Sequence, residues 1–84
     1  MKVRRRNGME EEFVREKIVV SVVKAGGKVE LGRAIAEEIE QELAASESAT
    51  TDEIRSRVLA KLKDRDLDTY NSWIEYDTKE GKIR

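Results

Sequence analysis

The sequence predicts an α+β fold, in which an N-terminal β-hairpin, with a short third strand as an option, caps a four-helix bundle. An Asn-Gly pair close to the N-terminus is typical of a tight turn between two strands. Beyond it, apolar residues recur at helical spacing through the middle of the chain. Turn and capping residues then divide this helical part into segments that are each too short to be stable without packing on the others.

Residues 3–13, VRRRNGMEEEF, predict the hairpin. Asn7 and Gly8 fit the two central positions of a type I′ turn, because both positions need a positive φ. One arm carries Arg4–Arg6 and the other carries Glu10–Glu12. From the charges alone, we favour ion pairs across the hairpin over the alternative, in which the arginines hold an anionic ligand such as a phosphate.

Residues 15–25 are compatible with a helix and with a strand. Their β-branched side chains favour a strand by propensity, whereas the spacing of Ile18 and Val22 would place both on one face of a helix. Gly26, the first of two glycines, could end a helix in the left-handed conformation. If the segment is helical, Lys17 lies at its start, where backbone N–H groups also attract anions. The residue pattern does not decide between these alternatives.

Three further helices and a C-terminal tail are expected over residues 30–45, 51–63, 67–77 and 78–84. The first of these helices has apolar residues every four positions, at Leu31, Ile35, Ile39 and Leu43. Thr50, followed by Glu53, or else Thr51 predicts the N-cap of the next helix. Asp66 or Asp68 would cap the last helix. Its inward-facing residues are expected at Leu67, Tyr70, Trp73 and Ile74.

The composition fits one domain over residues 1–84 and argues against catalysis. Charged residues make up 42% of the chain, against about 25% in a typical domain, yet the net charge is only −1. This balance indicates a surface rich in ion pairs rather than a strongly cationic nucleic-acid binder. Histidine and cysteine are absent, so we expect no enzyme and no metal site. The apolar runs are too short to span a bilayer, which suggests a cytoplasmic protein with no membrane partner.

Residues 3–18, VRRRNGMEEEFVREKI, resemble the opening of the ATP-cone domain, which has a valine, a basic pair before a glycine turn, a glutamate, and a Lys-Ile pair that begins the first helix. The segments TTDEIRSRVLAKL and YNSWIEYD are similar to the third and fourth helices of that family, so the resemblance covers essentially the whole chain. It implies a helix at Ile18–Val23 and a short strand at Ala49–Thr51. ATP cones are regulatory modules of ribonucleotide reductase large subunits and of the repressor of reductase genes. The resemblance therefore implies a non-catalytic module that binds ATP or dATP.

The resemblance also implies a nucleotide site, because seven residues match positions of the family motif: Val3, Arg5, Arg6, Glu11, Lys17, Ile18 and Thr51. The cationic members would hold phosphates, the glutamate would help to hold the nucleoside, and the two aliphatic members would flank the adenine. Thr51 could contact a phosphate or serve only as a helix cap. Mg²⁺ could accompany the nucleotide.

The mode of action and two alternative functions stay open. Because the chain ends where the resemblance ends, we expect it to act on a protein partner or by self-association, or to be a fragment of a longer protein. A first alternative is a ligand-free interaction domain, since Val14 stands where the family commonly has Asp or Asn and Asp77 where it commonly has Arg. A second is a small nucleic-acid-binding accessory protein that uses Arg4–Arg6, but the net charge of −1 makes direct nucleic-acid binding unexpected.

Overall fold

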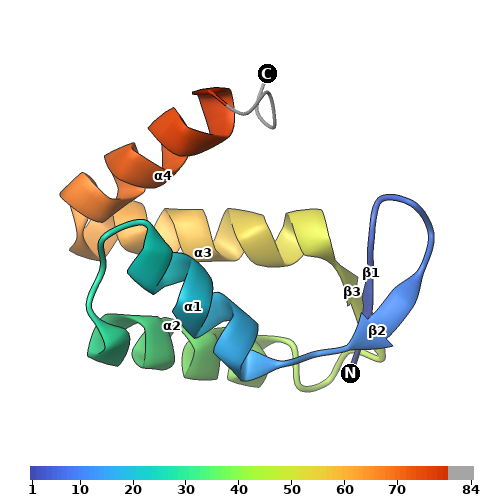
Figure 1. The fold of residues 1–84 in the computed structure, drawn as a ribbon. Coiled ribbons are helices and arrows are strands. Elements are labelled where there is room, and N and C mark those ends of the chain that lie inside the picture. The colour runs from blue at the N-terminus through green and yellow to red at the C-terminus, as the bar shows by residue number, and fades with distance from the viewer. Residues whose placement is uncertain (80–84) are drawn as a thin grey trace.

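A computed structural model describes residues 1–79, which form a small sheet followed by four helices (Figure 1). The strands are β1 (Lys2–Arg4), β2 (Glu10–Glu12) and β3 (Ser48–Thr50), and the helices are α1 (Arg15–Lys24), α2 (Val29–Glu42), α3 (Thr51–Arg65) and α4 (Leu67–Lys79). The predicted α+β class is confirmed. Thr78 and Lys79 belong to α4 instead of the predicted tail, and the rest of that tail lies outside the described residues. No helix in this part of the chain is long and apolar enough to cross a membrane.

The sheet has the strand order β2-β1-β3, so the first strand of the chain lies in its centre. β1 pairs antiparallel with β2, with Val3 opposite Glu11, and parallel with β3, with Val3 opposite Ala49. Val3 and Ala49 are both buried and belong to the core. The third strand expected at Ala49–Thr51 is therefore present, shifted by one residue, and it ties the hairpin to the start of α3.

The predicted type I′ turn is wrong. In residues 1–79 only glycines have a positive φ, and Gly8 (88°) is the one in the hairpin, so Asn7 does not meet the requirement. The Gly8 N–H donates to the Arg5 carbonyl (2.9 Å), and the Arg5 N–H donates to the Met9 carbonyl (2.8 Å). This pattern matches a three-residue loop in which a type I turn precedes a left-handed glycine. Asn7 Oδ1 accepts from the Met9 N–H (3.0 Å), a local bond that keeps Asn7 at negative φ.

The ambiguous segment after the hairpin is the helix α1, which buries Ile18, Val19 and Val22 on one helical face and leaves Val20 and Val23 exposed. Val22 is fully buried, and Ile18 lies one turn before it on the same face. The helix ends as the glycine predicts, since Gly26 has a φ of 105°. The Gly26 N–H donates to the Val23 carbonyl (3.0 Å) and the Gly27 N–H donates to the Val22 carbonyl (2.9 Å). These two bonds form a Schellman motif, which satisfies carbonyls at the helix end.

The core lies between α1, α2 and α3 and includes Val3 and Ala49 of the sheet. The predicted stripe of α2 is confirmed, with Ile35, Ile39 and Leu43 buried and Leu31 partly buried against the core. It meets the buried face of α3, which consists of Ile54, Val58 and Leu62. α2 also approaches α1 closely at Gly32, where a Cβ would lie 3.2 Å from Val19 Cα.

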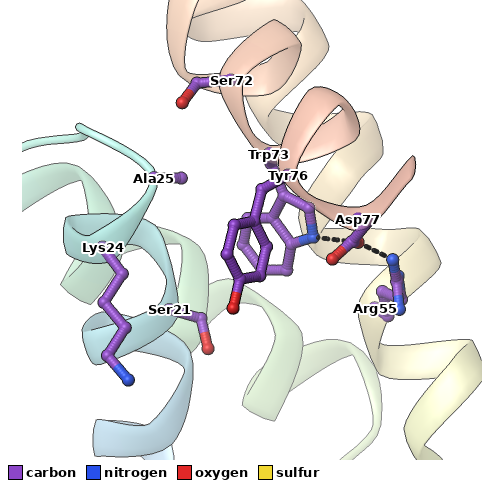
Figure 2. Close-up of a pocket in the computed structure, with 8 residues that line it drawn as sticks. All are labelled: Ser21, Lys24, Ala25, Arg55, Ser72, Trp73, Tyr76 and Asp77. Atoms are coloured by element: carbon purple, nitrogen blue, oxygen red, sulfur yellow. Dashed lines mark hydrogen bonds and ion pairs between the residues drawn. The ribbon is translucent and has the colours of Figure 1, made fainter. Parts of the chain in front are cut away.

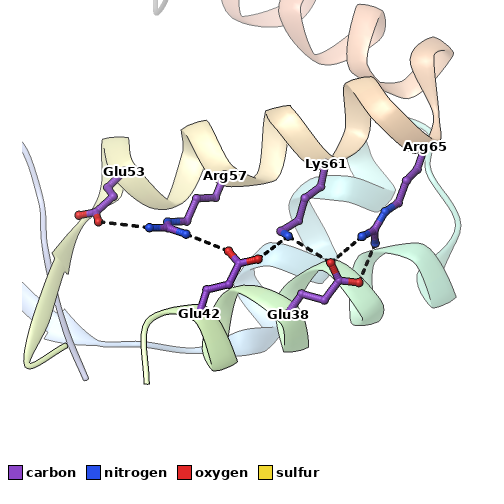
Figure 3. A network of polar contacts seen from close by, with 6 residues as sticks. All are labelled: Glu38, Glu42, Glu53, Arg57, Lys61 and Arg65. Carbon is purple, nitrogen blue, oxygen red and sulfur yellow. Dashed lines mark hydrogen bonds and ion pairs between the residues drawn. The ribbon is translucent and has the colours of Figure 1, made fainter. Parts of the chain in front are cut away.

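A ladder of ion pairs joins the exposed edges of α2 and α3 (Figure 3). Glu38 accepts from Arg65 (Nη2–Oε1, 2.6 Å) and from Lys61 (3.1 Å). Glu42 accepts from Lys61 (2.6 Å) and from Arg57 (2.9 Å). Part of the high content of balanced charges therefore forms ion pairs that join two helices.

Two of the competing cap predictions are resolved. Thr50 caps α3, since its Oγ1 accepts from the Glu53 N–H (3.0 Å). Asp66 caps α4, because its carboxylate accepts from both the N–H (3.2 Å) and the hydroxyl (2.6 Å) of Thr69. The inward orientation expected for Leu67 is wrong: it is 54% exposed, because it is the first residue of α4 and lies directly after the capping residue.

Candidate functional site

A cavity of about 180 Å³ lies between the sheet, α1 and α3, and we call it the inner cavity. Of the seven residues predicted for the site, five line it, namely Val3, Glu11, Lys17, Ile18 and Thr51. They come from β1, β2, α1 and the start of α3, so the sheet and two helices are all needed to assemble the cavity. Much of the remaining wall is apolar and comes from Phe13, Val14, Ile54 and Val58.

Glu11 connects the two predicted cations nearest to the inner cavity. Lys17 Nζ lies 2.7 Å from Glu11 Oε1, and Arg5 Nη1 lies 3.7 Å from Glu11 Oε2. The hydrogen bond from Lys17 holds the pKa of Glu11 below its ordinary value. Arg5 does not line the cavity itself, but its ion pair with Glu11 holds it at the cavity's edge.

Arg6 is directed to a different partner. Its Nε lies 3.1 Å from both carboxylate oxygens of Asp52, and its Nη2 lies 2.9 Å from Oδ1. Asp52 belongs to the first turn of α3, where the helix dipole also favours a negative charge. The pair lowers the pKa of Asp52. Arg6 thus binds a carboxylate with the fork geometry that a guanidinium also uses for phosphate, and it does so outside the inner cavity lining.

A larger cavity of about 570 Å³, which we call the outer cavity, is drawn in Figure 2. It is lined by Ser21 and Lys24 of α1, its C-cap residue Ala25, Arg55 of α3, and Ser72, Trp73, Tyr76 and Asp77 of α4. Three residues line both cavities: Ser21, Arg55 and Trp73. The two cavities are therefore neighbouring parts of one groove, and we use the word groove for both together.

Sequence reasoning did not assign Arg55 to the site, although a signal was available. Arg55 lies one helical turn after Thr51, and Ser21 lies one turn after Lys17, so each falls on the same face as a predicted residue. In the structure, Arg55 forms an ion pair with Asp77, whose side chain is only 6% exposed. Asp77 Oδ2 also accepts from Trp73 Nε1 (2.7 Å). Burial lowers the pKa of the Arg55 guanidinium from its ordinary value.

The groove combines apolar, aromatic and charged walls. Three cationic side chains line it, namely Lys17, Lys24 and Arg55, as do three carboxylates, namely Glu11, Glu12 and Asp77. Apolar walls with a few convergent polar groups are typical of sites for small organic ligands. Within residues 1–79 no three acidic side chains are grouped so that they could hold a metal ion.

Comparisons with known proteins bear on the family of the whole chain. A search of curated proteins returned no match to this chain. The family model for the ATP cone domain, in contrast, matches residues 1–82 of the 84 residues. The matched region includes every element of the fold and the whole lining of the groove. The chain therefore belongs to the ATP-cone domain family.

Proposed function

We propose that this protein is a regulatory module that binds ATP or dATP in the groove. ATP-cone domains are regulatory nucleotide-binding domains and are not catalytic, and the family match spans nearly the whole chain. The observation that carries the proposal is the inner cavity, where five residues chosen from the sequence motif, from Val3 to Thr51, line one space.

In this proposal the two cavities hold different parts of the nucleotide. The inner cavity suits the adenine, because Val3 and Ile18 offer buried aliphatic surface to a flat ring. Glu11 is an acceptor for nucleoside hydroxyl or amino groups, since its lowered pKa keeps it ionised. The outer cavity suits the phosphates, because Lys24 and Arg55 line it, and Lys17 lines the neighbouring inner cavity.

Arg5 and Arg6 of the hairpin would complete the site once they exchange their carboxylate partners for phosphate. Arg5 and Arg6 are exposed and paired with Glu11 and Asp52, so solvent screens both pairs and phosphate can compete for them at little cost. We propose that the hairpin then covers the phosphates, with Mg²⁺ as an optional companion of the nucleotide. Regulation would follow through a protein partner or through self-association of the nucleotide-bound chain.

Isothermal titration calorimetry with ATP and dATP tests the proposed function. We expect Lys17→Ala and Arg6→Ala to weaken binding about 10- to 100-fold, because each loses a charge-assisted phosphate contact worth about 1.5–3 kcal/mol. Lys63→Ala is the matched control, because it removes an exposed lysine of α3 that does not line the groove. Circular dichroism should show the same helical content in all variants.

Two results would contradict the proposal. If wild-type protein binds neither nucleotide, or if Lys17→Ala, Arg6→Ala and Lys63→Ala all bind as tightly as wild type, the groove is not the nucleotide site. Sedimentation of the protein with ATP and with dATP then tests the regulatory mode, since self-association predicts a nucleotide-dependent change in mass.

A further inference from the structure

The ion pair between Arg55 and Asp77 differs from the other ion pairs of the described residues in its burial. The Asp77 side chain is 6% exposed, whereas the other paired carboxylates lie at the surface. We infer that Asp77 is an internal substitute for phosphate, which occupies Arg55, one of the cations proposed to bind phosphate, until a ligand displaces it. This inference rests on the proposed function and adds that a carboxylate of the same chain competes with the phosphates of the ligand.

Arg55 has the position and the guanidinium geometry that a phosphate-binding residue needs. It lines both cavities, so a ligand that spans the groove must pass it. Its side chain is 24% exposed and remains reachable from the outer cavity. Its Nη2 is buried against the Asp77 carboxylate, so this ion pair occupies the inward-facing side of the guanidinium. A guanidinium binds carboxylate and phosphate oxygens with the same planar geometry.

The charge balance of the groove explains why displacement is required. Its three cations face three carboxylates, so the groove has no excess of positive charge for a polyphosphate. Two of these cations, Lys17 and Arg55, are already paired with acidic side chains. A phosphate gains a strong contact at Arg55 only if Asp77 gives it up, because two anions at one guanidinium repel each other.

Displacement of Asp77 couples ligand binding to the position of α4. A buried carboxylate without its cation is costly, so Asp77 must find water once phosphate takes Arg55. Asp77 and Trp73 lie one turn apart on α4 and share a hydrogen bond (2.7 Å), so both respond when this part of α4 moves (Figure 2). Phosphate binding and the packing of α4 on α3 are then thermodynamically coupled. Binding weakens this packing by the same factor by which the packing weakens binding.

Two substitutions that break the same ion pair separate this inference from a merely structural role. Asp77→Asn removes the competing charge but keeps an oxygen that can accept from Trp73. Arg55→Gln removes the phosphate-binding cation and leaves Asp77 in place. Glu75→Gln is the matched control, because it removes a carboxylate from an exposed position of the same helix, outside the groove lining.

Calorimetric titration of these full-length variants with ATP, and with adenosine as a ligand without phosphate, gives the test. We expect Asp77→Asn to bind ATP roughly tenfold more tightly than wild type and Arg55→Gln to bind it at least tenfold more weakly, within the range usual for coupled sites. Adenosine affinity should differ little between the variants, and Glu75→Gln should bind both ligands like wild type. The emission of Trp73, the single tryptophan of the chain, should change when ATP binds to wild type and change less in Asp77→Asn.

Each alternative outcome has a distinct meaning. If wild type binds ATP but both groove substitutions weaken binding equally, the pair only stabilises α4 and the inference is overturned. It is also overturned if Asp77→Asn strengthens ATP and adenosine binding to the same degree. Binding of ATP by Asp77→Asn but not by wild type also overturns it, because ATP then does not displace Asp77 in the natural chain. If no variant binds ATP, the proposed function fails and the inference fails with it.

Discussion

Single side chains of the hairpin and of α1 are held in place by carboxylates of the same chain. Arg5 and Lys17 share Glu11, and Arg6 holds Asp52 with two of its nitrogens. These pairs are exposed, so they contribute little to stability and are easily exchanged for another anion. These pairs hold the cationic side chains beside the groove, so little side-chain entropy is lost when a ligand binds.

The cap of α3 gives a prediction for one hydroxyl group. Thr50→Ala removes the oxygen that accepts from the Glu53 N–H, and we expect a loss of about 1 kcal/mol in the free energy of unfolding. Urea denaturation followed by circular dichroism measures this loss. Thr50→Ser keeps the hydroxyl and should retain most of the stability. Equal stability of Thr50→Ala and wild type would show that the cap contributes nothing.

The connection between α1 and α2 depends on two glycines for two different reasons. Gly26 has a φ of 105°, which an L-residue with a side chain rarely adopts. A Cβ at Gly27 would lie 2.6 Å from Cγ1 of the fully buried Val22 and 3.3 Å from Cγ2 of Thr69 in α4. The first glycine therefore meets a backbone requirement, and the second meets a packing requirement where the connection lies against α1 and α4.

We expect Gly26→Ala to lower the free energy of unfolding by about 1–2 kcal/mol, because the left-handed conformation is costly for alanine. Gly26→Asn is the matched control and should cost less, since asparagine tolerates this conformation. Chemical denaturation of both variants provides the comparison. If alanine and asparagine prove equally harmless, the end of α1 does not need a left-handed residue.

The ladder between α2 and α3 predicts how stability depends on pH. Hydrogen bonds from Arg65 and Lys61 lower the pKa of Glu38 from 4.5 to about 2. Because the folded pKa lies below the unfolded value, the contribution of Glu38 is fully present above about pH 4.5 and is lost as the pH falls toward 2. The hydrogen bond from Lys61 lowers the pKa of Glu42 as well, which adds a loss of the same sign.

Urea midpoints measured between neutral pH and pH 2 test this dependence. We expect the wild-type midpoint to fall steadily below about pH 4.5, and the midpoint of Glu38→Gln to fall less, because glutamine does not titrate. Glu37→Gln is the control, since that exposed carboxylate makes only a long ion pair (3.8 Å) with Arg15. A Glu38→Gln profile that parallels wild type would contradict the role given to the ladder.

The molecule as a whole brings distant segments together around the groove. Residues 3–25, which contain β1, β2 and α1, provide one wall, residues 51–58 of α3 provide a second, and residues 72–77 of α4 provide a third (Figures 1 and 2). A ligand that fills the groove contacts all three walls at once. It therefore opposes global unfolding, because the unfolded chain has no such site.

We expect ATP at 100 times its Kd to raise the free energy of unfolding by about 2.7 kcal/mol, if the unfolded chain does not bind it. Thermal melts over a series of ATP concentrations should show a midpoint that rises with the logarithm of the concentration. Lys17→Ala should need a higher ATP concentration for the same shift. A midpoint that ATP does not move, in protein shown to bind ATP, would mean that the nucleotide binds the unfolded chain equally well.

Local features of the fold were readable from the residues. The stripe from Leu31 to Leu43, the stop at Gly26 and the presence of a hairpin all depend on neighbours a few positions away, and the structure has them. Two local predictions went wrong for physical reasons. The turn around Asn7 could use a three-residue loop as well as a two-residue one. Leu67 has helical spacing but lies at a helix end, where less of the fold covers it.

The amino-acid order therefore specified the α+β class, two candidates for each of two helix caps, and the motif through which Val3, Glu11, Lys17, Ile18 and Thr51 could be found. Folding in three dimensions was needed to identify the rest of the groove. Arg55 meets Asp77 only because α3 and α4 pack together, and Arg6 meets Asp52 only because β3 fixes the start of α3 beside the hairpin. Periodicity and caps reflect interactions within one turn or one hairpin, whereas these contacts join residues that are separated by tens of positions. Their geometry follows from the packing of whole elements, which no local pattern in the sequence encodes.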